Sequence, residues 1–265
     1  MNYIWKEWKE ESRSKGIWLA LSMVILLSFF ILLEARTLPS EHGFTVFLLS
    51  LFEMNVLILP LLSIFIASFS IIQEKELKTL MILTTKQESF QSFLFKKSLA
   101  VQAVILGVFV AWYLLFAVVM KFSFYFNMNY FMAFLLSVIF LVIIFNQIGL
   151  FLGSICNTRM QLIGANIFTW FVFVFLADLL FLYLLPNVSY DNVQVFSIFF
   201  FLDPIHTIPF YLETSLGVIS VDHMSRLMEK MVWASPLLFL IIDTIVWVAL
   251  SFVLSILLKG KGERI

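Results

Sequence analysis

Apolar residues gather into long runs along this chain, and short polar stretches separate the runs. A helix needs about 20 apolar residues to cross the hydrocarbon core of a bilayer. The runs near that length or longer cover residues about 17–33, 44–72, 98–120, 131–155, 165–186 and 236–258. The pattern predicts an all-α polytopic membrane protein whose six transmembrane helices form a single domain over residues 1–265.

An amphipathic stretch, residues 1–16, precedes the first run with the sequence MNYIWKEWKEESRSKG. Helical spacing brings Met1, Ile4, Trp5 and Trp8 to one face, while the charged side chains lie away from it. This pattern predicts an N-terminal entry helix in the membrane interface, with Trp at headgroup depth. An ordinary flanking segment is the alternative.

The longest connection, residues 187–235, is mostly apolar. Pro204 and Pro209 break its apolar run, which is too short to cross a bilayer before Asp203. We therefore expect a re-entrant or interfacial segment there. A second amphipathic helix should follow, because Met224, Leu227, Met228 and Met231 fall on one helical stripe.

Lys and Arg are unevenly divided between the two sides of the predicted membrane. Six spans place both termini on one side, whose connections hold Lys6, Lys9, Arg13, Lys15, Lys75, Lys78, Lys86, Lys96, Lys97, Arg159, Lys259, Lys261 and Arg264. The other side holds Arg36, Lys121, Arg226 and Lys230. Cytoplasmic loops carry the excess of Lys and Arg, so both termini should be cytoplasmic. We expect a multi-pass protein of a bacterial cytoplasmic membrane.

Only 13% of the residues are charged and the formal net charge is +0, so the overall charge says nothing about partners. For a membrane protein of this kind we expect lipids around the spans and no nucleic-acid partner. The single cysteine, Cys156, excludes a disulfide within the chain and a cysteine metal cluster. Met residues near His206 and His223 could suit Cu(I), but their helical spacing fits an apolar stripe equally well. We predict no metal site and no catalytic residue.

Residues 73–97 form a charged segment with helical periodicity between the second and third spans. The preceding run, 44–72, would extend roughly 44 Å as a straight helix, longer than a hydrocarbon core of ~30 Å. Its end should therefore project into the cytoplasm. The apolar stripe through Leu77 and Leu80 then needs another surface to cover it. A separate cytoplasmic protein is the natural candidate, and a plain loop is the alternative.

The stretch from Glu74 to Leu83, EKELKTLMIL, resembles the segment after the second span of ABC type-2 export permeases. That segment commonly reads Glu-x-Glu-x-Gly-Thr-Leu-x-x-Leu, with a Lys near the start of the third span. The matching residues are Glu74, Glu76, Thr79, Leu80, Leu83 and either Lys96 or Lys97. Lys78 departs from the pattern because Gly is usual there, and TTKQES replaces a Pro and Arg often found further on.

The resemblance implies the membrane subunit of an ATP-driven exporter, with ATPase-coupling residues Glu74, Glu76, Thr79, Leu80, Leu83 and Phe90. It also implies a cytoplasmic ABC ATPase dimer and a second permease subunit as partners. None of the nine glycines belongs to a G-x-x-x-x-G-K-[ST] phosphate loop, so ATP and Mg would bind the partner. The chain alone should be neither an enzyme nor a cofactor protein.

A second stretch, LDPIH from Leu202 to His206, resembles the Leu-Asn-Pro-Ile/Val pattern of one branch of this family. That branch includes the copper-maturation permease for nitrous-oxide reductase. The substrate stays open between a lipid-like molecule, an antimicrobial peptide or antibiotic, and a copper or sulfur species.

Several polar residues lie inside the predicted spans. Glu53 and Asp178 are candidates for a substrate path, because a charge at mid-membrane is costly unless it faces the bundle or a cavity. Asp243 is a third acid, nearer the outer face. Gly149 and Gly153, four residues apart, predict close helix packing. The three acids would also suit an ion-coupled secondary transporter, and a non-transporting membrane scaffold is a further alternative.

Overall fold

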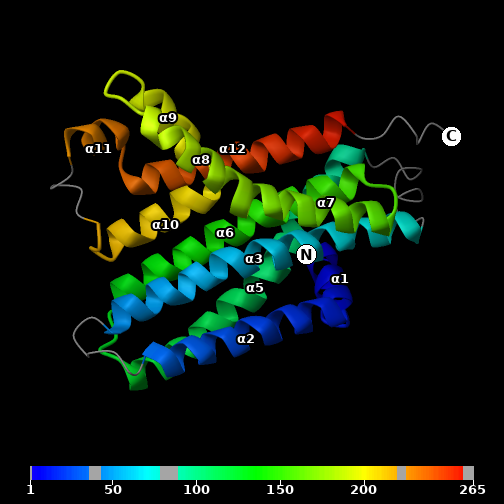
Figure 1. Cartoon of the computed structure of the whole chain (residues 1–265). Coiled ribbons are helices and arrows are strands. Elements are labelled where there is room, and N and C mark those ends of the chain that lie inside the picture. Colours follow the sequence, from blue (N-terminus) through cyan, green and yellow to red (C-terminus); the bar gives the residue numbers. More distant parts are fainter. Residues whose placement is uncertain (1, 36–42, 78–88, 220–224, 259–265) are drawn as a thin grey trace.

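The computed structural model describes residues 2–35, 43–77, 89–219 and 225–258, and this part of the chain is helical without any strand. Six helices, or continuous runs of helix, are long and apolar enough to cross a membrane. They are α2 (Lys15–Ala35), α3 (Gly43–Glu76), α5 (Phe90–Ser123), α6 (Met128–Ile155), the run from α7 to η2 (Arg159–Asn187) and α12 (Pro236–Leu257). They form an elongated bundle (Figure 1). The predicted all-α class and six long apolar helices are confirmed.

Helices α3 and α6 form the centre of the bundle, and they are the most buried of the six. Gly149 and Gly153 of α6 face α3 directly. A Cβ atom at Gly149 would lie 2.6 Å from the backbone oxygen of Ile64, and one at Gly153 would lie 2.7 Å from that of Ser68. The small-residue pair therefore lets the two backbones approach within this chain.

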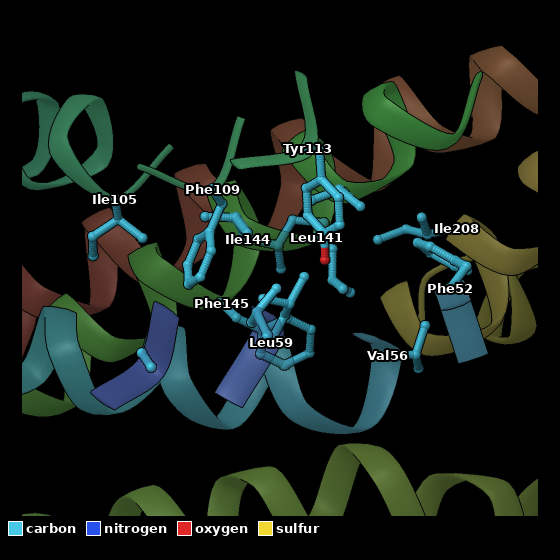
Figure 2. Close-up of a cluster of buried hydrophobic side chains, with 14 of the residues drawn as sticks. Phe52, Val56, Leu59, Ile105, Phe109, Tyr113, Leu141, Ile144, Phe145 and Ile208 are labelled. Carbon is cyan, nitrogen blue, oxygen red and sulfur yellow. The ribbon is translucent and has the colours of Figure 1, made fainter. Parts of the chain in front are cut away.

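Side chains from four helices fill the core around that pair (Figure 2). Helix α5 contributes Phe109 and Tyr113, and the hydroxyl of Tyr113 donates to the side-chain oxygen of Asn55 at 2.8 Å. Helix α10 reaches this core through Ile208, which lies beside Phe52 and Val56 of α3 in Figure 2. The core thus joins the long helices to one of the shorter ones.

Helices α3 and α5 are longer than the predicted spans 44–72 and 98–120. Both have 34 residues, and the additions are mainly at the end of α3 and the start of α5. Helix α3 runs through Pro60 without ending. Since proline removes a backbone hydrogen bond, the carbonyls of the preceding turn need other donors. The indole N–H of Trp170 donates to the Leu57 carbonyl at 2.8 Å.

The fifth span is the least covered by the rest of the chain. It consists of α7 (Arg159–Phe171), the π-helical turn η1 (Val172–Leu176), α8 (Ala177–Leu184) and the short 3₁₀ turn η2 (Leu185–Asn187). Most of its apolar side chains are exposed on the surface of the bundle. A surface of this kind suits contact with lipid or with another apolar protein.

Two short helices, α9 (Val193–Phe200) and α10 (Pro204–Ser215), meet at 96° and form a helical hairpin. Asp203 begins α10, because its carboxylate accepts a hydrogen bond from the Ile205 N–H at 3.1 Å and Pro204 follows it. The tip packs beside α12, where the indole of Trp247 donates to the Leu202 carbonyl at 2.7 Å.

Both legs of the hairpin lead to the same end of the bundle, where α3 and α12 begin. Helix α9 is tied to α11 (Arg226–Met231), which directly precedes α12, by a hydrogen bond from Ser197 to the Met231 carbonyl. Helix α10 runs back along the first half of α3, from Ile208 to Glu213. Figure 1 shows the same return. Both ends of the hairpin therefore lie at one end of the bundle, and a re-entrant or interfacial position for residues 187–235 stays a prediction.

Helix α1 (Asn2–Glu11) crosses the opposite end of the bundle at a steep angle to the long helices (Figure 1). It packs on α5, while Trp5 and Trp8 remain exposed. We call this the α1 end of the molecule, and the other the hairpin end. The sidedness of the two ends and an interfacial position for α1 stay predictions.

Candidate functional site

A lysine is buried at the α1 end, where α1, α3 and α5 meet. The Lys97 side chain of α5 is only 1% exposed, and its ammonium donates to the Glu7 carboxylate of α1 at 2.7 Å. The same ammonium lies 3.4 Å from Glu74 of α3, which also accepts from Lys6 of α1 at 2.9 Å. Two cations and two anions therefore join three helices.

Burial makes these contacts obligatory. A buried charge is tolerated only when an opposite charge and hydrogen bonds replace its lost water. Burial raises the pKa of Glu7, although Lys97 opposes that shift. Burial, together with the nearby Glu7 charge, raises the pKa of Glu11, at the end of α1, to about 7. Helix α1 is thus held by charge pairs that exist only when it is docked.

The carboxylates of Glu7, Glu10 and Glu74 come close enough together to hold a metal ion. The ammonium groups of Lys6 and Lys97 already contact this group. They take the place that a cation would take, so the arrangement is that of an ion-pair network.

The end of α3 is tied to two further elements. The Lys75 ammonium donates to the carbonyls of Ser154 and Cys156, at 2.6 and 3.0 Å, which lie at the end of α6. A cation suits this position, because the last carbonyls of a helix lack partners within the helix. One turn later in the chain, Arg159 of α7 makes a two-pronged ion pair with Glu76.

The structure describes three of the six predicted coupling residues, Glu74, Glu76 and Phe90. Glu74 faces inward and is buried in the ion-pair network, whereas Glu76 is exposed and pairs with Arg159. Phe90 is half-buried at the start of α5. Thr79, Leu80 and Leu83 lie outside the described residues. Leu77, the last described residue after α3, is 64% exposed, so an apolar side chain points outward beside this end.

The predicted path acids belong to separate places. Glu53 is exposed and lines a cavity of about 280 Å³ between α3 and α10, together with Glu213. Asp178 lies beside the hairpin tip, 3.5 Å from Nε2 of His206. The structure therefore pairs each acid with a residue of the 187–235 segment, not with the other acid.

Sequence reasoning missed the group around His206. The sequence suggested only a copper-ligand role for this histidine, whereas the structure places it at the hairpin tip with its Nδ1 2.9 Å from Asp203. Asp243 of α12 is fully buried nearby, one turn before Trp247, whose indole binds the Leu202 carbonyl at the tip. The available signal was the Asp-x-x-His spacing at the start of a helix, which places both side chains on one face.

No family model and no curated protein matches this chain.

Proposed function

We propose that this chain is the membrane subunit of an ATP-driven exporter of the ABC type. A separate cytoplasmic ATPase would act on it through residues 73–97. The observation that carries the proposal is the bracing of the end of α3. Three consecutive residues, Glu74, Lys75 and Glu76, each bind a different neighbouring element.

Because of those contacts, a movement of the end of α3 would be passed to the neighbouring helices. Glu74 connects α3 to α5 through Lys97 and to α1 through Lys6. Lys75 connects α3 to the end of α6, and Glu76 connects it to α7. A force on the connection after residue 77 would therefore act on five helices together. Rigid-body movements of this kind are how interfaces pass a nucleotide-driven change into a domain.

An outward-facing apolar side chain supports a docking role for the same place. Leu77 directly follows the braced turn and is 64% exposed, with charged Glu76 beside it. The stripe predicted through Leu80 continues in the sequence from Leu77. An apolar residue at a charged rim is typical of a surface that another protein covers.

In this proposal the partner binds ATP and this chain spans the membrane. Without a phosphate loop of its own, the chain would leave ATP and Mg binding to the partner, which the resemblance describes as an ATPase dimer. The resemblance also implies a second membrane subunit. The exposed apolar surface of the fifth span is available for lipid or for such a subunit.

The test is co-purification of the full-length tagged chain from its native membranes in a gentle detergent. We expect an ATPase with a G-x-x-x-x-G-K-[ST] loop in stoichiometric amount, and ATP hydrolysis in the purified complex. Leu77→Asp should remove this partner. Leu258→Asp is the matched control, since Leu258 is 53% exposed beyond the end of α12.

The outcomes separate clearly. Loss of the ATPase from Leu77→Asp but not from Leu258→Asp supports docking at the end of α3. The proposal fails if no ATPase accompanies the wild-type chain, or if both variants retain it equally.

A further inference from the structure

The tip of the α9–α10 hairpin gathers four ionisable side chains from three parts of the chain. Asp203 and His206 belong to the tip itself, and Asp178 lies beside it on α8. Asp243 lies on α12 one turn from two residues that contact the tip: Phe239 stacks on Phe201, and Trp247 donates to the Leu202 carbonyl.

The fifth span ends at Asn187, and Asp178 lies nine residues before it. Helix α12 begins at Pro236, and Asp243 lies seven residues after it. At 1.5 Å per residue, both are roughly 10–14 Å from the hairpin end, inside the apolar part of the bundle.

The imidazole of His206 lies between two carboxyl groups. Its Nδ1 is 2.9 Å from Asp203 and its Nε2 is 3.5 Å from Asp178. A neutral imidazole can donate at one ring nitrogen and accept at the other, so it can bridge a carboxylate and a carboxylic acid. The ring therefore connects the two carboxyl groups.

Asp243 gives independent evidence for a bound cation at the tip. It is 0% exposed, and neither of its side-chain oxygens accepts a hydrogen bond from the described residues. The neighbouring indole N–H of Trp247 donates instead to the Leu202 carbonyl. A carboxylate without a donor or counter-ion is unstable in such a place, so the group must be neutralised.

No lysine or arginine of the surrounding described elements supplies that charge. Helix α6, which packs on α10 and α12, contains no charged residue. On α7, Arg159 pairs with Glu76 at the α1 end, and on α11, Lys230 binds the carbonyl of Tyr190.

The other charged groups near the hairpin do not neutralise Asp243 either. Arg226 and Glu229 lie on α11, which packs on α9 instead of the tip. Glu213 at the far end of α10 faces Glu53 of α3, and both are acids. The smallest cation, a proton, fits a fully buried carboxyl that receives no hydrogen bond from the described residues.

We propose that the hairpin tip is a proton-binding site. Asp243 holds a proton inside the bundle, and Asp203, His206 and Asp178 connect it to the surface, where the Asp178 side chain is 58% exposed. This site is independent of the ATPase partner.

The exchange of one proton through this chain balances without any further reactant. Starting from neutral imidazole with its proton on Nε2, the Asp203 carboxylic acid gives its proton to Nδ1 while Nε2 gives its proton to the Asp178 carboxylate. The Asp203 carboxylate then takes the proton of Asp243, and Asp178 carries the released proton on the exposed side of α8. No bond other than O–H and N–H forms or breaks, and the phenyl rings of Phe181 and Phe200 keep the imidazole in place.

The test is infrared spectroscopy of the full chain in lipid bilayers with ¹³C-labelled aspartate carboxyl groups, which separates aspartate from glutamate bands. At pH 7 we expect a protonated aspartate band that Asp243→Asn removes. On transfer to D₂O, this band should exchange more slowly in His206→Gln by roughly 100-fold, the lower end of what a positioned proton-transfer group contributes. Glu53→Gln is the control and should leave both band and rate unchanged.

The labelled wild-type chain keeps the test decisive even if Asp243→Asn does not fold. Absence of any protonated aspartate band at pH 7 overturns the proposal, and so does a band that survives in folded Asp243→Asn. An exchange rate that His206→Gln leaves unchanged overturns the route through the imidazole.

Discussion

Replacing Lys97 by Met should release α1 from the bundle. The substitution keeps the volume of the side chain but removes the ammonium 2.7 Å from Glu7, whose side chain is 1% exposed. Removing one partner of a buried ion pair costs about 3–5 kcal/mol, because the other charge stays buried without compensation. Glu74 suffers less, since Lys6 still binds it at 2.9 Å.

The cost should appear as local opening of α1. At 1.36 kcal/mol per factor of ten, the lost ion-pair free energy corresponds to amide exchange in residues 2–11 that is faster by on the order of 10²–10³-fold. The acceleration cannot exceed the value set by the whole free energy that docks α1. Hydrogen exchange followed by mass spectrometry measures this in bilayers. Lys96→Met is the matched control, because Lys96 is the adjacent but exposed lysine.

A double variant tests the electrostatic reasoning itself. Lys97→Met combined with Glu7→Leu removes both charges, and a buried pair replaced by apolar groups is often neutral in free energy. We expect exchange in α1 to return close to the wild-type rate. If Lys97→Met leaves exchange unchanged, or if the double variant is no better than the single one, the ion pair does not hold α1.

Two further predictions concern stability, measured as the free energy of unfolding by SDS titration in bicelles. Gly149→Ala should destabilise by roughly 1–3 kcal/mol because its Cβ would meet the Ile64 backbone at 2.6 Å, whereas Gly164→Ala, with open space around it, should not; equal effects would contradict the α3–α6 packing. Stability should also fall as the pH rises from about 4.5 to 7, because the folded state holds the Glu11 proton up to a pKa of about 7. The loss is up to roughly 3 kcal/mol, since each pKa unit is 1.36 kcal/mol. Glu11→Gln should remove it, and an unchanged pH profile would refute that assignment.

The long helices were predictable because a membrane span is encoded locally. A run of about twenty apolar residues identifies a span without any knowledge of its packing partners, so α2, α6 and α12 could be predicted directly from the sequence. The predicted spans 44–72 and 98–120 are shorter than α3 and α5, and most of the additional residues belong to the segment 73–97, for which the sequence predicted helical periodicity. Their polar extensions are helical because the charges at 74 and 97 find partners in other helices, which hydropathy does not register.

The polar sites were harder to predict, because they depend on which helices meet. The segment 73–97 was identified from its charges, but nothing in one sequence assigns Glu74 to Lys97 and Glu76 to Arg159. His206 is a similar case. Its contacts depend on the 96° bend between α9 and α10, which brings the imidazole close to Asp178 in another helix.

The pairing of Glu7 with Lys97 also fixes an order of assembly during synthesis. The two residues are 90 positions apart, so α1 leaves the ribosome well before its partner exists. At roughly 5–20 residues per second, the delay is on the order of 5–20 s. During that time the carboxylates of α1 must stay in water or at the membrane surface. Helix α1 is therefore made before α5 but can reach its packed position only after α5 has been made.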